Sequence, residues 1–461
     1  MKKDSMKQKI GLVLFGVFFC MILIEVGLRV GGFIMLSIQE HRNLVSINKN
    51  GIYKILCLGG STTADGGEYS YPAQLQEILN SKNVGIEFKV INKGVSGADS
   101  AFVLSNLNEN LNKYDPDMVI TMMGINDDVD TIPYDNSFKT KLLMLFRGLR
   151  VYKLSKSIVL HINNKIHEMN NESEKENEYV VIRKRNSIEV SNLIEEWMAY
   201  SSDGKHKDAE MVIKKAIEIE PTNTDLYVML GDGYIQQRKF VKAEQSINRA
   251  LEMSPNDPWV LYELGMCYRK QKKYSKAEEV LLKATISDPM YREPYSELAT
   301  MYRQQRKIKN LLTLCDRINK KGLKSDYFYG FLANCYSESG KHDEAEKFYE
   351  KANQYRLNNY KEATAFNYNK IKEIVAQKGI KHVCMQYPVR NVEPLKKIFE
   401  STEGMVFVDN EKSFKLMLRN HSYGEYFFDN FGGDFGHCMP KGNKLLAENV
   451  ARVIIDKFFK M

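Results

Sequence analysis

Short apolar runs alternate with amphipathic helical segments in two parts of the chain, one before the middle and one after it. Strands that alternate with helices form a parallel sheet with helices on both faces. We therefore predict an α/β fold whose two halves are separated by an insertion. The predicted strands are 53–58, 88–92, 117–123, 382–386 and 405–408, and the predicted helices are about 72–79, 99–111, 364–378 and 443–459.

The middle of the chain repeats every 34 residues. Small residues in such a repeat let two helices approach each other, and proline ends the second helix before the next unit begins. The pattern resembles the tetratricopeptide repeat over about 190–356, with a degenerate unit at about 290–322 where Leu311 replaces the expected alanine. We therefore predict an all-α solenoid. The repeating positions are Pro221, Pro255 and Pro289; Ala209, Ala243, Ala277 and Ala345; Tyr234, Tyr268, Tyr302 and Tyr336; and Gly231, Gly265, Ala299 and Ala333.

The N-terminal region carries a long apolar run. It covers 10–24 without interruption, follows four lysines, and resumes to about Leu36 after Glu25 and Arg29. A membrane-spanning helix needs about 20 apolar residues, and Glu25 and Arg29 share a helical face on which they can pair. A cleaved signal peptide is the alternative, but no small-residue cleavage site follows. We expect an uncleaved single-pass anchor in the inner or plasma membrane, with the lysines in the cytoplasm and the remaining chain outside it.

The composition excludes some classes of protein. The formal net charge of +8 comes from 66 basic and 58 acidic residues, and the basic residues form no block. A nucleic-acid-binding protein concentrates them on one face or tail, so we expect no nucleic-acid partner. The seven cysteines form neither CxxC pairs nor a Cys/His zinc spacing. We therefore predict neither a metal site nor a cofactor.

Three residues stand just after predicted strands of the first half: Ser61, Gly94 and Asn126. In parallel sheets, binding sites lie beyond the carboxyl ends of the strands. We therefore expect these three residues to share one edge of the sheet. Taken singly, each also has an ordinary structural explanation, such as a turn or a helix cap.

Four sequence blocks around these residues resemble the SGNH/GDSL hydrolase family, over about 51–130 and 361–461. The resemblance implies a flavodoxin-like hydrolase fold with a serine nucleophile. One departure is Gly60, which stands where the family often has aspartate. The inserted repeats account for the long interval between Asn126 and His437. The blocks are Leu58-Gly59-Gly60-Ser61-Thr62, Asn92-Lys93-Gly94, Gly124-Ile125-Asn126-Asp127 and Asp434-Phe435-Gly436-His437.

The resemblance assigns a role to each of these residues. A serine hydroxyl is a weak nucleophile until a base takes its proton, so Ser61 is the expected nucleophile and His437 the expected base. The backbone N–H groups of Ser61 and Gly94 and the side-chain amide of Asn126 are expected to form the oxyanion hole. Gly94 also allows a close backbone approach that a side chain would block.

Two aspartates compete for the acid that orients His437. Asp434 stands three residues before the histidine, as in the family's DxxH block, and Asp429 lies in the same stretch. We prefer Asp434 because of its spacing. The predicted catalytic triad is therefore Ser61, His437 and Asp434.

Together these patterns favour a membrane-anchored, extracytoplasmic serine esterase or deacylase that acts on a carboxylic ester, with an acylated cell-surface glycan as one candidate substrate. The closest alternative is an O-acyltransferase for a cell-surface polysaccharide with the same triad. A third is a tetratricopeptide scaffold with an inactive hydrolase fold, which the intact Ser61, Asn126 and His437 argue against. The array is expected either to bind a protein or peptide segment or to act as a rigid spacer.

These predictions divide the chain into an anchored hydrolase with an inserted array. Because repeats contact mainly their neighbours, we expect the array to fold by itself and to be dispensable for cleavage of a small ester. The predicted parts are a cytoplasmic tail at 1–9, a membrane anchor at 10–36, a first hydrolase half at 51–135, a helical segment and linker at 136–188, the repeat array at 189–356 and a second hydrolase half at 361–461.

Overall fold

The computed structural model describes residues 39–40, 43, 51–128, 130–148, 188–202 and 204–459. The chain divides into two compact units, one with residues 145–294 and one with residues 39–144 and 295–461. No helix within the described ranges is both long and apolar enough to cross a membrane. The predicted tail, the predicted anchor and most of the predicted linker lie outside those ranges.

Five parallel strands form one sheet in the order β2-β1-β3-β4-β5. This is the flavodoxin-like order, so the predicted parallel sheet is confirmed. β3 and β4 are neighbours, with Val119 opposite His382, although the repeats separate them in the sequence. Both halves of the chain therefore complete a single sheet. The strands are β1 (Ile52–Gly59), β2 (Glu87–Gly94), β3 (Met118–Met122), β4 (Lys381–Met385) and β5 (Met405–Val408).

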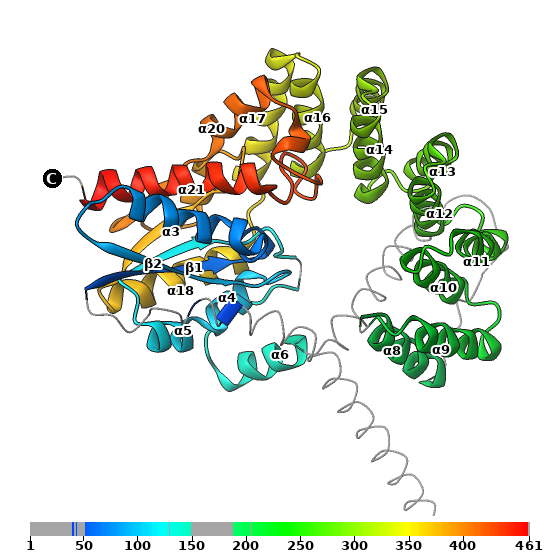
Figure 1. Ribbon diagram of the computed structural model, residues 1–461, viewed down its shortest axis with the longest axis horizontal. Coiled ribbons are helices and arrows are strands. Elements are labelled where there is room, and N and C mark those ends of the chain that lie inside the picture. The colour runs from blue at the N-terminus through cyan, green and yellow to red at the C-terminus, as the bar shows by residue number, and fades with distance from the viewer. Residues whose placement is uncertain are drawn as a thin grey trace, which may run out of the picture. The chain divides into compact units, whose positions relative to one another are not determined.

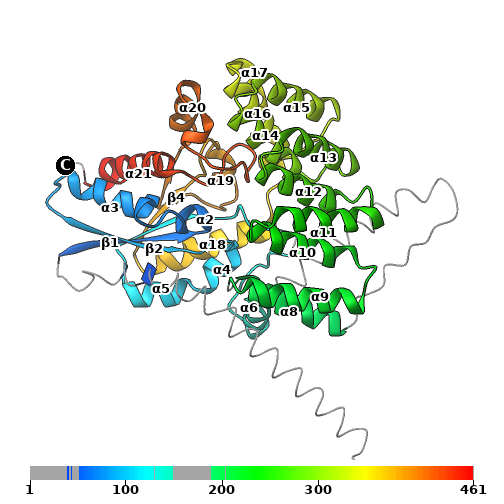
Figure 2. The ribbon, with the colours of Figure 1, turned by 45° about the vertical axis from the view of Figure 1, so that its right-hand side comes forward.

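Helices cover both faces of the sheet (Figure 1 and Figure 2). α3 and α21 lie together on one face, and α4, α5 and α18 cover the other. The helix that was expected over 99–111 is divided at Asn106, which ends α4 and begins α5. The short helices α19 and α20 were not predicted. The bounds are α3 (Tyr71–Ser81), α4 (Ser100–Ser105), α5 (Leu107–Tyr114), α18 (Glu362–Gln377), α19 (Glu393–Lys397), α20 (Glu411–Asn420) and α21 (Pro440–Ile454).

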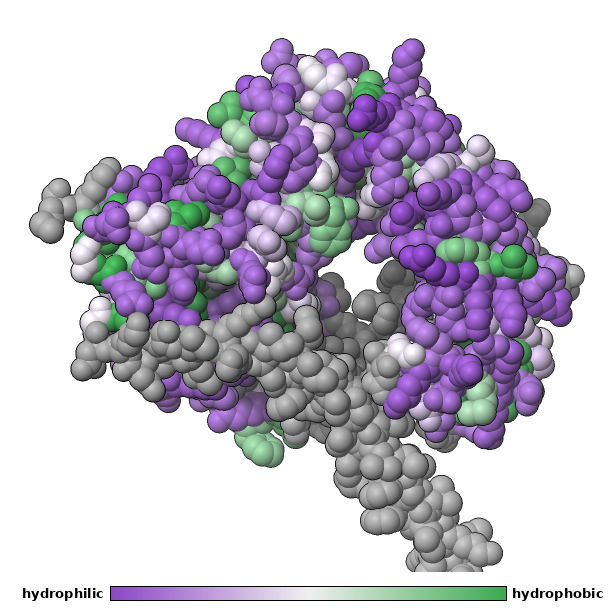
Figure 3. Space-filling model, viewed as in Figure 1, coloured by the Kyte–Doolittle hydropathy of each residue, from purple (hydrophilic) through white to green (hydrophobic). Residues whose placement is uncertain are grey.

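The repeats form five pairs of helices whose surface is mainly hydrophilic in the view of Figure 3. Small residues lie where paired helices meet: a side chain at Gly231 would lie 2.4 Å from Ile247, and one at Gly265 would lie 2.6 Å from Leu281. The helices are α8 (Ile188–Ser202), α9 (His206–Ile219), α10 (Thr224–Gln236), α11 (Phe240–Met253), α12 (Pro258–Lys270), α13 (Tyr274–Ser287), α14 (Arg292–Gln304), α15 (Ile308–Lys320), α16 (Asp326–Glu338) and α17 (His342–Asn358).

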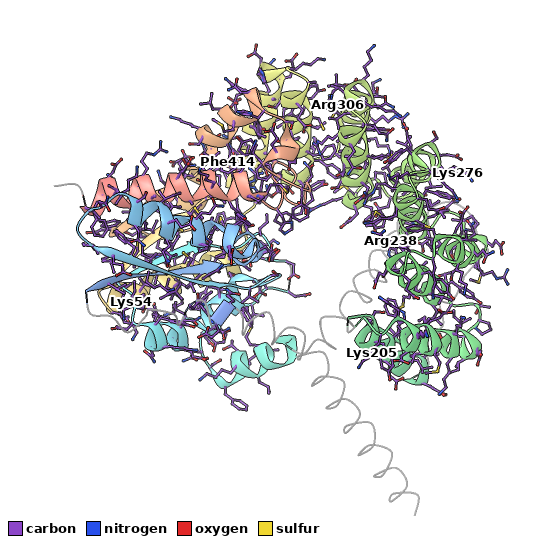
Figure 4. The ribbon with its side chains drawn as sticks, in the orientation of Figure 1. Lys54, Lys205, Arg238, Lys276, Arg306 and Phe414 are labelled. Atoms are coloured by element: carbon purple, nitrogen blue, oxygen red, sulfur yellow. The ribbon has the colours of Figure 1, made fainter. Side chains whose placement is uncertain are left out.

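One residue with positive φ closes the turn inside every repeat. These residues are 34 positions apart, and three of them carry basic side chains: Arg238, Lys272 and Arg306, with φ values of +57°, +59° and +57°. Gly204 and Gly340 occupy the same position in the first and last repeats. Figure 4 marks Arg238 and Arg306. A left-handed conformation is costly for any residue with a side chain, so its recurrence at this position shows that the turn requires it. This requirement was not predicted from the sequence.

The first part of the predicted 136–188 segment is helical. α6 (Phe138–Gly148) follows the sheet, and Met144 packs against the hydrophobic core that lies between the strands and α18. This contact joins α6 to the hydrolase part of the chain.

Candidate active site

Ser61 lies at the carboxyl end of β1, where the chain turns into the short helix α2 (Ser61–Ala64). The turn is tight, because a side chain at Gly59 would lie 2.3 Å from the Met122 carbonyl oxygen. Ser61 is buried. Its backbone N–H has no hydrogen-bond acceptor within the described ranges, as is usual in the first turn of a helix. Ser61 therefore offers both a hydroxyl and an unused N–H donor at this edge of the sheet.

His437 connects Ser61 to an aspartate. Its Nε2 lies 2.9 Å from Ser61 Oγ, and its Nδ1 lies 2.7 Å from Asp429 Oδ2. The other carboxylate oxygen of Asp429 accepts the His437 backbone N–H at 2.9 Å. This order of acid, base and hydroxyl is the one in which a carboxylate orients a histidine toward a serine.

The protonation of Asp429 sets the tautomer of His437. Burial raises the pKa of Asp429, but hydrogen bonds from the His437 side chain and backbone lower it, and the net pKa lies below the ordinary value. The carboxylate is therefore ionised at neutral pH and can only accept a hydrogen bond, so Nδ1 carries the proton. Nε2 is left with a lone pair facing the Ser61 hydroxyl.

Asp434, which we predicted to be the acid, does not contact His437. Its side chain is fully buried and binds two arginines: Oδ1 accepts from Arg390 Nε at 3.0 Å, and Oδ2 accepts from Arg356 Nη2 at 2.5 Å. The prediction from three-residue spacing was wrong because it treated the chain before His437 as locally regular. Asp429, the rival, occupies the predicted position.

A hairpin-like loop places Asp429 beside His437. We call residues 426–439 the acid–base loop. Its two arms are joined by the Phe428 N–H, which donates to the His437 carbonyl at 3.1 Å, and by the Met439 N–H, which donates to the Tyr426 carbonyl at 2.8 Å. Asp429 and His437, which are eight residues apart, are therefore brought together, while the intervening tip directs Asp434 elsewhere.

The Asn126 side chain lies next to the turn that holds Ser61. A side chain at Gly60 would approach Asn126 Nδ2 to 2.9 Å, and Nδ2 itself donates to the Ala98 carbonyl at 3.1 Å. Glycine at position 60 thus leaves room for the amide in this structure. Asn126 therefore lies beside Gly60, the residue that precedes Ser61. The adjacent Asp127 is structural, since it accepts hydrogen bonds from the Ser100 N–H and hydroxyl at 2.7 Å each.

Gly94 has a structural role that differs from the predicted one. A side chain there would lie 2.4 Å from the Ala64 nitrogen, so the predicted need for close backbone approach holds. Its N–H, however, donates to Asn92 Oδ1 at 3.0 Å. The N–H of Gly97 has no acceptor within the described ranges, and Gly97 immediately precedes Ala98, which accepts from Asn126. Of these two glycines, Gly97, three residues beyond β2, is therefore the one whose N–H is not already bonded within the described ranges.

Aromatic rings surround the histidine. Phe431 stacks on His437 with a centroid distance of 4.2 Å, and Phe428 stacks with a distance of 5.3 Å. Phe428 is 60% exposed, which is unusual for a phenylalanine beside a buried serine. Phe414 of α20, labelled in Figure 4, is fully buried and stacks on Phe427 at 5.7 Å, so it supports the first arm of the loop. Within the described ranges, no cluster of acidic, histidine or cysteine side chains could hold a metal ion.

Comparisons with known proteins agree with both parts of the chain. Residues 57–169 match the GDSL-like Lipase/Acylhydrolase family, and residues 198–223, 234–301 and 327–359 match tetratricopeptide repeat families. No curated protein matches the chain.

Similar solved structures include MamA, PilF from Pseudomonas aeruginosa, and the first tetratricopeptide domain of Spaghetti bound to an HSP90 peptide. MamA is 18% identical over 36% of this chain and 91% of its own, with a TM-score of 0.29. PilF is 17% identical over 41% of this chain and 86% of its own, with a TM-score of 0.30. The Spaghetti domain is 20% identical over 27% of this chain and 98% of its own, with a TM-score of 0.25. From the family matches, this chain combines a GDSL-like lipase/acylhydrolase domain with tetratricopeptide repeats.

Proposed function

We propose that this chain is a serine-dependent esterase or acyltransferase in which Ser61, His437 and Asp429 form the catalytic triad. The observation that carries the proposal is the pair of hydrogen bonds at His437, 2.9 Å to Ser61 Oγ and 2.7 Å to Asp429 Oδ2. A GDSL-like acylhydrolase domain supports an enzyme that acts on esters.

In this mechanism, His437 Nε2 takes the Ser61 proton as Oγ attacks the ester carbonyl carbon. The carbonyl π electrons move to oxygen, and the oxyanion is held by the Ser61 N–H, the Gly97 N–H and the Asn126 amide. The intermediate collapses, the C–O bond to the alcohol breaks, and the imidazolium gives its proton to the departing alkoxide. Asp429 stabilises the imidazolium throughout. The acyl group is then ester-linked to Ser61.

The acceptor in the second step decides between hydrolysis and transfer. His437 deprotonates either water or an alcohol, which attacks the acyl-serine carbonyl. The bond between the acyl carbon and Ser61 Oγ then breaks, and the imidazolium returns its proton to Oγ. The exposed Phe428 ring beside His437 favours an acceptor with an apolar face, such as a sugar, because carbohydrate C–H groups pack on aromatic rings. An acylated glycan as donor, or a glycan hydroxyl as acceptor, is the substrate class that we propose.

Labelling with a fluorophosphonate probe and turnover of a nitrophenyl ester test the triad. Ser61→Ala should abolish both, whereas Ser81→Ala, which removes an exposed hydroxyl bonded only to the Ile78 carbonyl, should change neither. Full labelling of the Ser61→Ala chain would refute the nucleophile assignment. With sugar hydroxyl acceptors added to the assay, the ratio of free carboxylic acid to newly formed sugar ester then distinguishes hydrolysis from transfer.

The repeats support a role in protein–protein interaction. The partner is proposed to be a protein or peptide segment, and residues 10–36 are proposed to anchor the chain in the membrane with the hydrolase outside the cytoplasm. The apolar run behind four lysines supports this topology. Retention in membranes after an alkaline wash, together with protease cleavage in intact spheroplasts, is the expected result; protection in intact spheroplasts contradicts the orientation.

A further inference from the structure

The tip of the acid–base loop is buried although it carries no catalytic side chain. Asn430, Asp434 and Phe435 are all 0% exposed. Burying an amide and a carboxylate is costly unless each is fully hydrogen-bonded, so their partners must hold the loop in place. Those partners come largely from the last repeat helices, α14 to α17, which belong to the same compact unit as the sheet.

Arg303 of α14 connects a repeat to both sides of the catalytic aspartate. Its Nη1 donates to the side-chain oxygen of Asn430, the residue directly after Asp429. Its guanidinium lies 4.5 Å from the centroid of the Tyr423 ring, and the Tyr423 hydroxyl donates to the Asp429 carbonyl at 2.8 Å. Glu338 of α16 holds the guanidinium by accepting from Nε at 2.8 Å. Arg303 therefore fixes the backbone on which the Asp429 carboxylate stands.

α16 contacts the loop tip so closely that side chains are excluded. Asn334 Nδ2 donates to the Gly433 carbonyl at 2.9 Å. A side chain at Gly433 would lie 2.3 Å from the Tyr327 carbonyl oxygen, and one at Gly330 would lie 2.7 Å from Asp434. Two glycines, one from the repeat and one from the loop, thus allow backbone contact between them.

Arg356 of α17 completes the contact through Asp434. Together with Arg390, it neutralises this fully buried carboxylate, one oxygen bonded to each guanidinium. Charge-assisted bonds of this kind are strong and direction-specific. Removing one arginine leaves a buried charge with half of its partners, which is strongly unfavourable.

We propose that Arg303, Asn334 and Arg356 are positioning residues that keep Asp429 and His437 in catalytic alignment, so that the last repeats are part of the catalytic unit. The proposal rests on the triad described above. A misplacement of about 1 Å far from the reacting atoms typically costs about 10²-fold in rate. This positioning role differs from the expectation that the array is dispensable for cleavage of a small ester, because the positioning side chains belong to the array itself.

The test uses point variants of the full chain. Arg303→Met and Arg356→Met should lower kcat for a nitrophenyl ester by about 10²-fold with KM changed less than about twofold, because the bonds act on the reacting groups and not on the substrate. Arg317→Met, an exposed arginine of α15, is the matched control and should leave kcat unchanged. Arg303→Lys should retain part of the activity, since it keeps the charge but loses the bidentate geometry.

Hydrogen exchange of the backbone amides at 426–439 gives a second readout that does not depend on activity. Exchange there should rise in Arg303→Met and stay at the wild-type level in Arg317→Met. If Arg303→Met fails to fold, the double variant Arg303→Met with Glu338→Gln removes the unpaired carboxylate, and its kcat should remain low. Wild-type kcat, or unchanged exchange, in folded Arg303→Met and Arg356→Met refutes the positioning role. Absent esterase activity and absent Ser61 labelling in the wild-type chain refute the proposed function instead, while exchange still reports on the loop.

Discussion

The two parts of the repeat array share one helical framework but direct their polar side chains differently. In α8 to α13, polar contacts join one repeat to the next: the Tyr234 hydroxyl donates to Glu210 at 2.8 Å, and the Tyr268 hydroxyl donates to Glu244 at 3.0 Å. In α14 to α17, Arg303, Asn334 and Arg356 contact the acid–base loop. The 34-residue period therefore describes how the helices pack, whereas side chains at other positions decide what each repeat contacts.

The most direct test of this comparison separates Asp429, the proposed catalytic acid, from Asp434, which the last repeats bind. Asp429→Asn should lower kcat by about 10⁴-fold with the fold intact, because the amide favours the wrong tautomer of His437. Asp434→Asn should instead destabilise the protein by about 3–5 kcal/mol, since two buried arginines lose their nearest charged partner and keep only the more distant Asp326. Nitrophenyl ester turnover and urea unfolding measure the two effects. A large stability loss in Asp429→Asn with normal turnover would reverse the assignment.

Removal of repeats should affect activity according to which repeats are removed. A chain that lacks 188–287 should keep kcat within about threefold, because the contacts to the acid–base loop come from later helices. A chain that lacks 188–360 should lose about 10²-fold or more, since Arg303, Asn334 and Arg356 are all gone. Both proteins are compared as monodisperse fractions from gel filtration. Equal activity of the two shortened chains contradicts a positioning role for the last repeats.

Acid should destabilise the hydrolase unit through His382. Burial lowers the pKa of His382 from 6.5 to about 4. The unfolded chain therefore binds a proton between about pH 6.5 and 4 that the folded chain does not, so stability is full above pH 6.5 and falls as the pH drops toward 4. The loss at pH 4 is about 3 kcal/mol.

Urea midpoints of the full chain at several pH values measure this effect. His382→Gln, which does not titrate and can keep the bond to Thr121 Oγ1, should flatten the dependence in this range. If the urea midpoint depends on pH in the same way in His382→Gln as in the wild-type chain, other groups cause the acid sensitivity.

The smallest effect is expected between the early repeats. Tyr234→Phe removes one hydrogen bond to Glu210 and should cost about 1 kcal/mol of stability in that unit. It should leave ester turnover unchanged, since no contact of Tyr234 reaches the triad. Thermal unfolding followed by circular dichroism, with Tyr227→Phe as a more exposed comparison, measures the change. Reduced turnover in Tyr234→Phe would mean that the early repeats also influence the active site.

Much of the fold could be predicted from the sequence because each signal was local. Buried strands are continuous apolar runs, and all five predicted strands appear within about two residues of their expected bounds. The 34-residue period placed the repeat helices for the same reason. α19 was missed because its five residues are too few to show a helical period, and α20, although amphipathic, begins without a side-chain cap. The helix expected over 99–111 is divided at Asn106 by a turn that its apolar pattern does not reveal.

The sequence by itself determined the parallel sheet, the helical repeats, and the serine, histidine and asparagine that meet at one sheet edge. Only the tertiary structure decided which aspartate bonds to the histidine, which of Gly94 and Gly97 has an N–H without an acceptor in the described ranges, and which repeat helices contact the acid–base loop. The physical reason is that these properties depend on partners distant in the chain. Asp434 is held away from His437 by Arg356 and Arg390, which no spacing around His437 could reveal.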